Sequence, residues 1–115
     1  MVDYPLSGDY EGLYAPAKNL ILLDVHLSPI QRRCVLAHEI SHARHRDTAC
    51  EHDGAMEARA DREAARMLLS VVAYAAAEQV YDGNTHMMAL ELGVMPWVVD
   101  AYREWLHDNP NMAIQ

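Results

Sequence analysis

The chain of 115 residues has no long apolar run, no excess of basic residues and only two cysteines. No stretch approaches the roughly 20 apolar residues that a membrane-spanning helix needs. The first nine residues contain no basic region followed by an apolar one, so a signal peptide is not expected. The protein is therefore predicted to be cytoplasmic.

Positive charge is scarce: nine lysines and arginines stand against 17 aspartates and glutamates, which gives a net charge of −8. DNA and anionic membranes are bound through clustered Lys and Arg side chains. Direct nucleic-acid binding and membrane association are therefore not expected. The acidic balance favours solubility and partners with basic surfaces.

Phenylalanine is absent, and 51% of the residues are hydrophobic. Abundant Ala and Met favour packed helices over a sheet sandwich, and the length suits a single domain over 1–115. If a helix runs from Cys34 to Arg46, Cys34 lies about 18 Å before its end. The residues leading to Cys50 reach back at most about 13 Å, so a disulfide is not expected. Cys34 is interpreted as a small buried hydrophobe, and Cys50 stays open as a soft metal ligand.

The N-terminal third of the chain predicts a small sheet. Residues 1–9 are punctuated by Pro, Gly and Asp and are expected to form an irregular arm. Residues 11–14 and the apolar run 20–23 are predicted strands that pair as an antiparallel hairpin. A hairpin alone is marginal in water, so it must pack on helices. With the helices that follow, this predicts a mostly helical α+β fold.

A strongly capped helix is predicted over 29–46. Ser28 is a good N-cap, Pro29 suits the first helical position and Gln31 completes a capping box. Basic residues over 44–46 suit the negative end of the helix dipole. The helix is apolar on two sides, which places it inside the domain.

A second long helix is predicted to begin near Ala55 and either to continue past Ser70 or to break there. Arg59, Glu63 and Arg66 lie three and four residues apart along this helix. They are interpreted as a charged face in solvent.

Two shorter helices close the chain. The first is predicted over 85–92 and ends at Gly93, and the second begins at Pro96. The aromatic and apolar residues between Trp97 and Leu106 form one stripe, which is interpreted as core.

Residues 38–42 read His-Glu-Ile-Ser-His, the pattern H-E-x-x-H. On a helix, His38 and His42 are one turn apart and point the same way. They can hold one Zn²⁺, with Glu39 beside them as general base. Catalytic zinc sites use three protein ligands and leave a fourth position to water. One zinc ion per chain is therefore the expected cofactor.

The third ligand is sought among the acids and histidines that follow. Glu57 is the first choice, because it begins the next helix after a short loop. Asp61 lies one turn further on the same face, where a carboxylate can accept the N–H that a ligand histidine directs outward. Other residues within reach by sequence stay open as ligands: Glu63, Glu51, Asp53, His45 and His52. A simpler interpretation of the motif is a pair of surface histidines beside an ordinary Glu.

A site of this kind would hydrolyse a peptide bond. Zinc brings the pKa of its water near 7 and polarises the scissile carbonyl, while Glu39 takes a proton and passes it to the leaving amine. The substrate is expected to lie as an added strand along the free edge of the strand at 20–23. Tyr74 and His86 stay open as oxyanion donors, with core packing and surface exposure as their simpler interpretations.

These motifs resemble the ImmA/IrrE family of zinc metallopeptidases, which are gluzincin-like. Residues 20–24 followed by 32–42 are similar to the family's strand and its R-x-x-L-A-H-E-x-x-H helix. Residues 57–69 are similar to its E-x-E-A-[ND]-x-F-A helix, whose first Glu, here Glu57, is the third zinc ligand. Arg59 stands where that helix has its second Glu.

The resemblance covers residues 12–106 and implies a small zincin-like catalytic core over 10–81. Residues 89–99 are similar to the family's helix-turn-helix-like segment, which here implies C-terminal helices over 84–107. The family implies an intracellular endopeptidase that cleaves a helix-turn-helix repressor and so relieves repression. Such proteins are often encoded by phages and mobile elements.

The alternative is a non-catalytic regulator, in which zinc stabilises the fold and the domain works by binding a repressor or another protein. An intact Glu39 argues against this alternative, because a purely structural zinc site needs no base and usually fills its fourth position.

Overall fold

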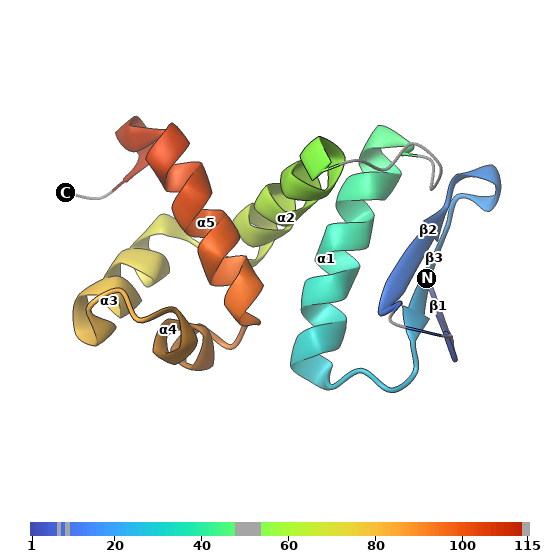
Figure 1. Ribbon diagram of the computed structural model, residues 1–115, viewed down its shortest axis with the longest axis horizontal. Helices are drawn as coiled ribbons and strands as arrows, with labels where there is room; N and C mark the ends of the chain where they lie inside the picture. Colours follow the sequence, from blue (N-terminus) through green and yellow to red (C-terminus); the bar gives the residue numbers. More distant parts are fainter. Residues whose placement is uncertain (7, 9, 48–53, 114–115) are drawn as a thin grey trace.

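The computed structural model describes residues 1–6, 8, 10–47 and 54–113. Within these residues the chain forms three strands and five α-helices (Figure 1), which confirms the mostly helical α+β prediction. In chain order they are β1 (Val2–Tyr4), β2 (Gly12–Ala15), β3 (Leu20–Asp24), α1 (Pro29–His45), α2 (Gly54–Leu68), α3 (Val71–Tyr81), α4 (Thr85–Leu92) and α5 (Pro96–Asp108). The sheet lies at one end, α1 packs beside it, and α3, α4 and α5 lie at the other end.

The strands form one mixed sheet in the order β1-β3-β2. β2 and β3 pair antiparallel, with Leu13 opposite Leu22, so the predicted hairpin is confirmed. The turn between them closes at Asn19, which adopts the left-handed conformation with φ 48°. Leu23 and Tyr14 are almost fully buried, and they help to anchor the sheet in the molecule.

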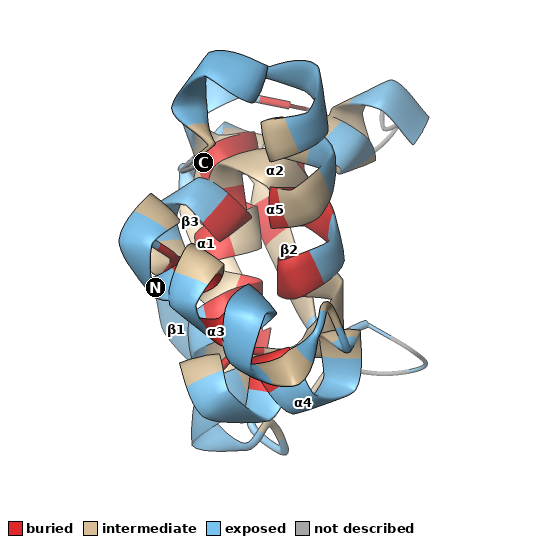
Figure 2. Ribbon diagram, turned by 90° about the vertical axis from the view of Figure 1, so that its left-hand side faces the viewer, coloured by how far each residue is buried: buried red, intermediate tan, exposed pale blue. Residues whose placement is uncertain are grey.

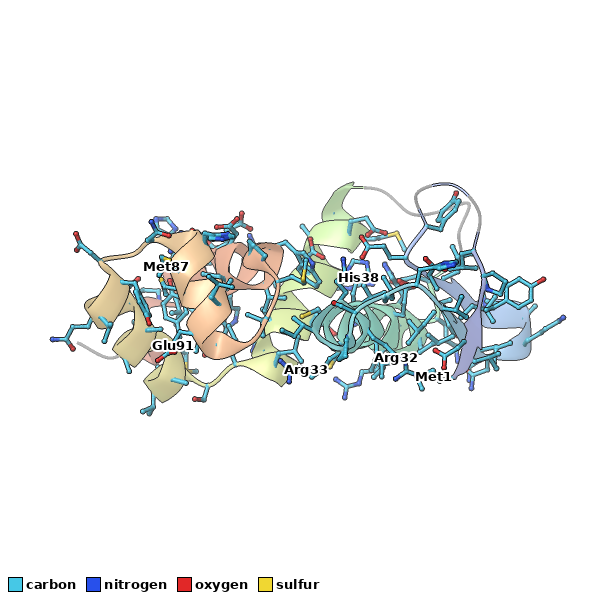
Figure 3. All side chains as sticks on the ribbon, turned by 90° about the horizontal axis from the view of Figure 1, so that it is seen from below. Met1, Arg32, Arg33, His38, Met87 and Glu91 are labelled. Carbon is cyan, nitrogen blue, oxygen red and sulfur yellow. The ribbon has the colours of Figure 1, made fainter. Side chains whose placement is uncertain are left out.

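Two expectations about the sheet are wrong. The N-terminal arm is not irregular, because Val2–Tyr4 form β1 and pair in parallel with β3. β3 is therefore the central strand and has no free edge for a substrate. All of β1 is exposed, so it shows no apolar alternation that local sequence could reveal. An ion pair of 3.1 Å between Arg32 and Asp3 ties this strand to α1, and Figure 3 shows Arg32 close to Met1.

Helix α1 begins with the predicted capping box. The Ser28 hydroxyl accepts from the Gln31 amide at 3.2 Å, and the Gln31 side chain accepts from the Ser28 amide at 2.9 Å. The helix ends at His45, one residue before the predicted end, because Arg46 turns into the left-handed conformation with φ 52°. Cys34 is a free thiol with no exposed surface, as its interpretation as a buried hydrophobe predicted.

The second predicted helix breaks at Ser70, whose hydroxyl caps α3 by accepting from the Ala73 amide at 3.1 Å. The last two helices have the predicted starts, and Gly93 ends α4 in the left-handed conformation at φ +68°. Figure 2 shows buried residues along the inward sides of these helices. The core there includes Met88, Val98 and Val99, all with 0% exposed surface. No helix in the described ranges is long and apolar enough to cross a membrane.

Gly12 lets β2 approach α1 closely beside the predicted general base. A Cβ atom at Gly12 would lie 2.7 Å from the Val35 Cγ1 atom and 3.1 Å from the Glu39 Cγ atom. We expect Gly12→Ala to lower the free energy of unfolding by about 1–3 kcal/mol through overpacking, measured by urea denaturation. Gly54→Ala is the control, because a Cβ there meets nothing within 4 Å. Equal stability of Gly12→Ala and the parent chain would contradict this close contact.

Candidate metal centre

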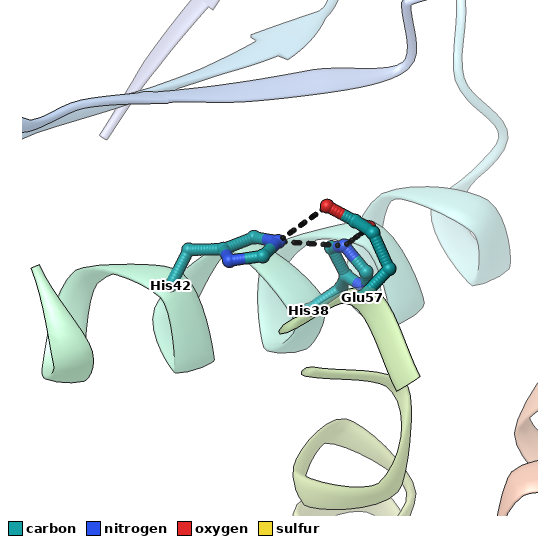
Figure 4. A group of neighbouring side chains, drawn as sticks. All are labelled: His38, His42 and Glu57. Carbon is teal, nitrogen blue, oxygen red and sulfur yellow. Dashed lines mark hydrogen bonds and ion pairs between the residues drawn. The ribbon is translucent and has the colours of Figure 1, made fainter. Parts of the chain in front are cut away.

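Three side chains meet between α1 and α2, as Figure 4 shows. The Nε2 atoms of His38 and His42 are 3.1 Å apart. The Glu57 carboxylate lies 3.0 Å from the His38 Nε2 atom and 3.2 Å from the His42 Nε2 atom. The two histidines are one turn apart on α1, and Glu57 lies in the first turn of α2. The donor atoms lie within 4.8 Å of one another and could hold a metal ion.

The outer nitrogen of each histidine faces its own carboxylate. The His38 Nδ1 atom lies 2.8 Å from Asp61, and the His42 Nδ1 atom lies 2.8 Å from Asp47. An imidazole that donates its Nδ1–H to a carboxylate keeps a lone pair on Nε2. Two such lone pairs and a carboxylate, about 3 Å apart, repel one another unless a cation or a proton lies between them. The donor set therefore fits a metal ion.

Sequence reasoning placed Asp61 beside the ligands but did not find Asp47. Asp47 is 6% exposed and follows the left-handed turn at Arg46, which brings its amide 3.0 Å from the His42 carbonyl oxygen. The guanidinium of Arg59 also contacts the Asp47 carboxylate. Burial alone would raise the pKa of Asp47, but the hydrogen bond with His42 and the positive charge of Arg59 outweigh it and lower the pKa.

A second group of contacts joins α1 to α2 nearer the C-terminal end of α1, around Glu63. The Glu63 carboxylate accepts from the Ser41 hydroxyl at 3.1 Å and lies 2.7 Å from the His45 Nε2 atom. Glu63 and His45, both considered as ligands, therefore contact each other instead of the metal donors. Arg59 and Glu63 pair with each other at 3.8 Å on the charged face, and Arg66 is exposed, as expected. Arg59 and Glu63 are only partly exposed, however, because Glu63 contacts Ser41 of α1 and Arg59 contacts Asp47 just after that helix. The other open ligands lie outside the described residues: Cys50, Glu51, His52 and Asp53.

The surroundings of His38 change its proton affinity. Burial lowers the pKa of His38, but the hydrogen bond with Asp61 and the negative charges of Glu39, Asp61 and Glu57 outweigh it, so the pKa rises above the ordinary 6.5. A proton on His38 therefore stabilises the metal-free fold below pH 6.5, and this contribution is lost as the pH rises through the folded-state pKa.

In the metal-free chain we expect His38 to titrate above pH 6.5. Asp61→Asn removes the hydrogen-bonding anion and should lower this pKa, as measured by NMR of the imidazole nitrogens. His26, which pairs with Asp24 on β3, provides an internal reference in the same spectra. A His38 pKa that is unchanged in Asp61→Asn would contradict the assigned cause.

A hollow of about 280 Å³ opens beside these residues. Glu39, which is 6% exposed, lines it together with His38 and Asp61. The remaining lining comes from α1, from α5, from the first residue of β2 and from the two residues before it: Val35, Trp97, Gly12, Tyr10 and Glu11. The predicted base therefore lies at an open hollow.

Sequence reasoning assigned Trp97 to the core, but its side chain also lines this hollow. Its ring lies edge-on to the His38 ring, with centroids 6.0 Å apart and an interplanar angle of 87°. Tyr74 and His86 are not among the lining residues. Tyr74 is 2% exposed and its hydroxyl contacts Arg103 and Glu78, which supports its interpretation as core.

A comparison with protein-family models identifies the class of this chain. The model described as the IrrE N-terminal-like domain, a peptidase family, matches residues 5–100. The chain belongs to this family, and a metallopeptidase-type function follows from it. No curated protein and no solved structure gives a significant match.

Proposed function

We propose that this chain is a zinc-dependent endopeptidase that binds one zinc ion through His38, His42 and Glu57. The observation that carries the proposal is the meeting of three metal-ligating atoms beside Glu39 at an open hollow. Two imidazoles and one carboxylate are a ligand set that catalytic zinc sites use. The two Nε2 atoms lie 3.1 Å apart. One oxygen of the Glu57 carboxylate lies 3.0 Å from the His38 Nε2 atom, and the other oxygen lies 3.2 Å from the His42 Nε2 atom.

When bound, zinc polarises the scissile carbonyl and makes a water molecule more acidic. Glu39 then has the role of general base, taking a proton from the attacking water and delivering it to the leaving amine. Its burial beside the ligands keeps its carboxylate near the reacting atoms. Asp61 and Asp47 hold the two imidazoles in the orientation that directs each Nε2 atom toward the ion.

The substrate strand is expected at β2 rather than at β3. β2 pairs with β3 along one edge, and among the described residues no strand pairs with its other edge. Gly12, the first residue of β2, and Glu11 just before it line the hollow together with Glu39. An extended peptide added to this edge would pass in front of the general base.

The substrate class that we propose is a protein partner, specifically a helix-turn-helix transcriptional repressor whose cleavage relieves repression. The family membership supports a peptidase, and the resemblance of residues 32–42 and 57–69 to the ImmA/IrrE motifs supports the repressor. The competing function is a regulator that binds the same partner without cutting it.

Substrate trapping separates these two functions. The Glu39→Gln variant is loaded with zinc, immobilised and exposed to lysate of cells that contain the gene for this chain and the genes beside it. It should retain the partner uncut. The purified partner should then be cut by the parent chain at one bond, identified by mass spectrometry of the new termini. A partner that binds both proteins equally and is never cut would support the non-catalytic regulator instead.

Asp47 should contribute to zinc affinity although it is not a ligand. Asp47→Asn removes the anion that accepts from His42 and faces Arg59. We expect zinc affinity to fall by about 10- to 100-fold, measured by competition with a chelating dye. The matched control is Asp24→Asn, which alters a carboxylate–histidine pair away from the metal centre. Equal affinities of Asp47→Asn and the parent chain would exclude this role.

A further inference from the structure

Trp97 brings the C-terminal helices into the candidate active site. It lies in the first turn of α5, 59 residues after His38, with its ring edge-on to that ligand. It lines the hollow at Glu39 and also a second hollow of about 350 Å³ that lies between α2 and α5. The Trp97 side chain therefore lies between two cavities, and Asp61 also lines both of them.

The segment that leads into α5 contacts α1. The guanidinium of Arg33 donates to the Gly93 carbonyl oxygen, and the Met95 amide lies 3.5 Å from the Cys34 sulfur atom. Val98 and Val99, the next residues of α5, have no exposed surface. Trp97 is thus placed at the cleft by core packing, and a ligand that contacts its ring need not order it first.

The hollow at Glu39 offers an apolar surface for one side chain. Val35 lies one turn before Glu39 on α1, Trp97 adds an aromatic ring, and Gly12 adds no side chain of its own. Three acids also line the hollow: Asp61 contacts His38, Glu39 is the proposed base, and Glu11 is exposed. The volume of about 280 Å³ is below that of a typical drug-sized site and suits a single residue.

We propose that Trp97 is a specificity-determining residue, which with Val35 forms an apolar subsite for a large aromatic or aliphatic side chain next to the scissile bond. This inference rests on the proposed peptidase function, because it assigns one part of the same cleft. It gives the C-terminal helices a direct part in choosing the cleaved bond. Burial of a large apolar side chain favours binding by about 10- to 100-fold over alanine.

Hydroxamates test the subsite without a known substrate. The zinc-loaded full chain is titrated calorimetrically with acetohydroxamate and with the hydroxamates of N-acetyl-alanine, N-acetyl-phenylalanine and N-acetyl-lysine. We expect the phenylalanine compound to bind about 10- to 100-fold more tightly than the alanine compound. In Trp97→Ala this preference should be lost, while acetohydroxamate, which has no side chain, should bind as it does to the parent chain.

Matched variants keep the test decisive. Trp105→Ala changes the same residue type on the same helix. The Arg66 guanidinium lies over the Trp105 ring, 4.6 Å from the ring centroid, and Trp105 lines neither of the two hollows. This variant should keep the preference, and Trp97→Phe should keep part of it and report on folding. An unchanged preference in Trp97→Ala, or tighter binding of the lysine compound, would overturn the subsite. Failure of acetohydroxamate itself to bind the parent chain would instead count against the zinc centre and the proposed function.

Discussion

Replacing Glu39 with glutamine should strongly slow cleavage of the protein partner while leaving the metal bound. Glutamine keeps the shape of the side chain but cannot take a proton from water at neutral pH. The expected loss is about 10²- to 10⁴-fold in the rate of cleavage, the usual contribution of a positioned general base. Single-turnover cleavage of the trapped partner measures it, with zinc content determined on the same samples.

Glu11→Gln is the matched control for this result. Glu11 is an exposed acid that lines the same hollow, and the proposed mechanism gives it no proton to carry. Its replacement should leave the cleavage rate near that of the parent chain. Cleavage by zinc-loaded Glu39→Gln at the parent rate would contradict the assignment of Glu39 as base.

The second large effect is expected from Glu57→Gln, which should weaken zinc binding by more than about 100-fold. This loss is larger than the usual effect of replacing a carboxylate that only contacts a ligand histidine. The amide removes the negative charge that lies 3.0 and 3.2 Å from the two histidine nitrogens. Competition with a chelating dye measures the affinity at pH 8, where protons compete less with zinc for its ligands.

Glu63→Gln makes the same chemical change six residues later on α2. Glu63 contacts Ser41 and His45 instead of the metal donors, so this variant should bind zinc nearly as tightly as the parent chain. If Glu63→Gln lost zinc and Glu57→Gln kept it, the third ligand would be wrongly assigned.

Local periodicity made the centre of the candidate site predictable. His38 and His42 share a helix face through their spacing of four residues, and Glu57 and Asp61 share another in the same way. The capping box at Ser28 predicted the start of α1. A break at Ser70 was one of two alternatives, and the structure places the N-cap of α3 there. These signals depend on neighbouring residues alone.

The features that sequence reasoning missed depend on distant partners. β1 forms because its backbone pairs with β3 some 20 residues later, and its exposed side chains give no pattern. Asp47 reaches His42 only because Arg46 reverses the chain. The apolar stripe on α5 showed which face is buried, but it did not show that Trp97, in the first turn of the helix, borders the cleft. Each of these needed the positions of elements relative to one another.

Zinc-edge X-ray absorption of the zinc-loaded parent chain tests the central claim most directly, because it reports the atoms bound to the ion. Two histidine nitrogens and one carboxylate, with a position open to water, predict only nitrogen and oxygen neighbours at about 2.0–2.2 Å. The signal of two imidazole rings should be present, and Glu57→Gln should change the oxygen shell. A sulfur neighbour at about 2.3 Å, or four protein ligands with no position for water, would contradict a catalytic centre built from His38, His42 and Glu57.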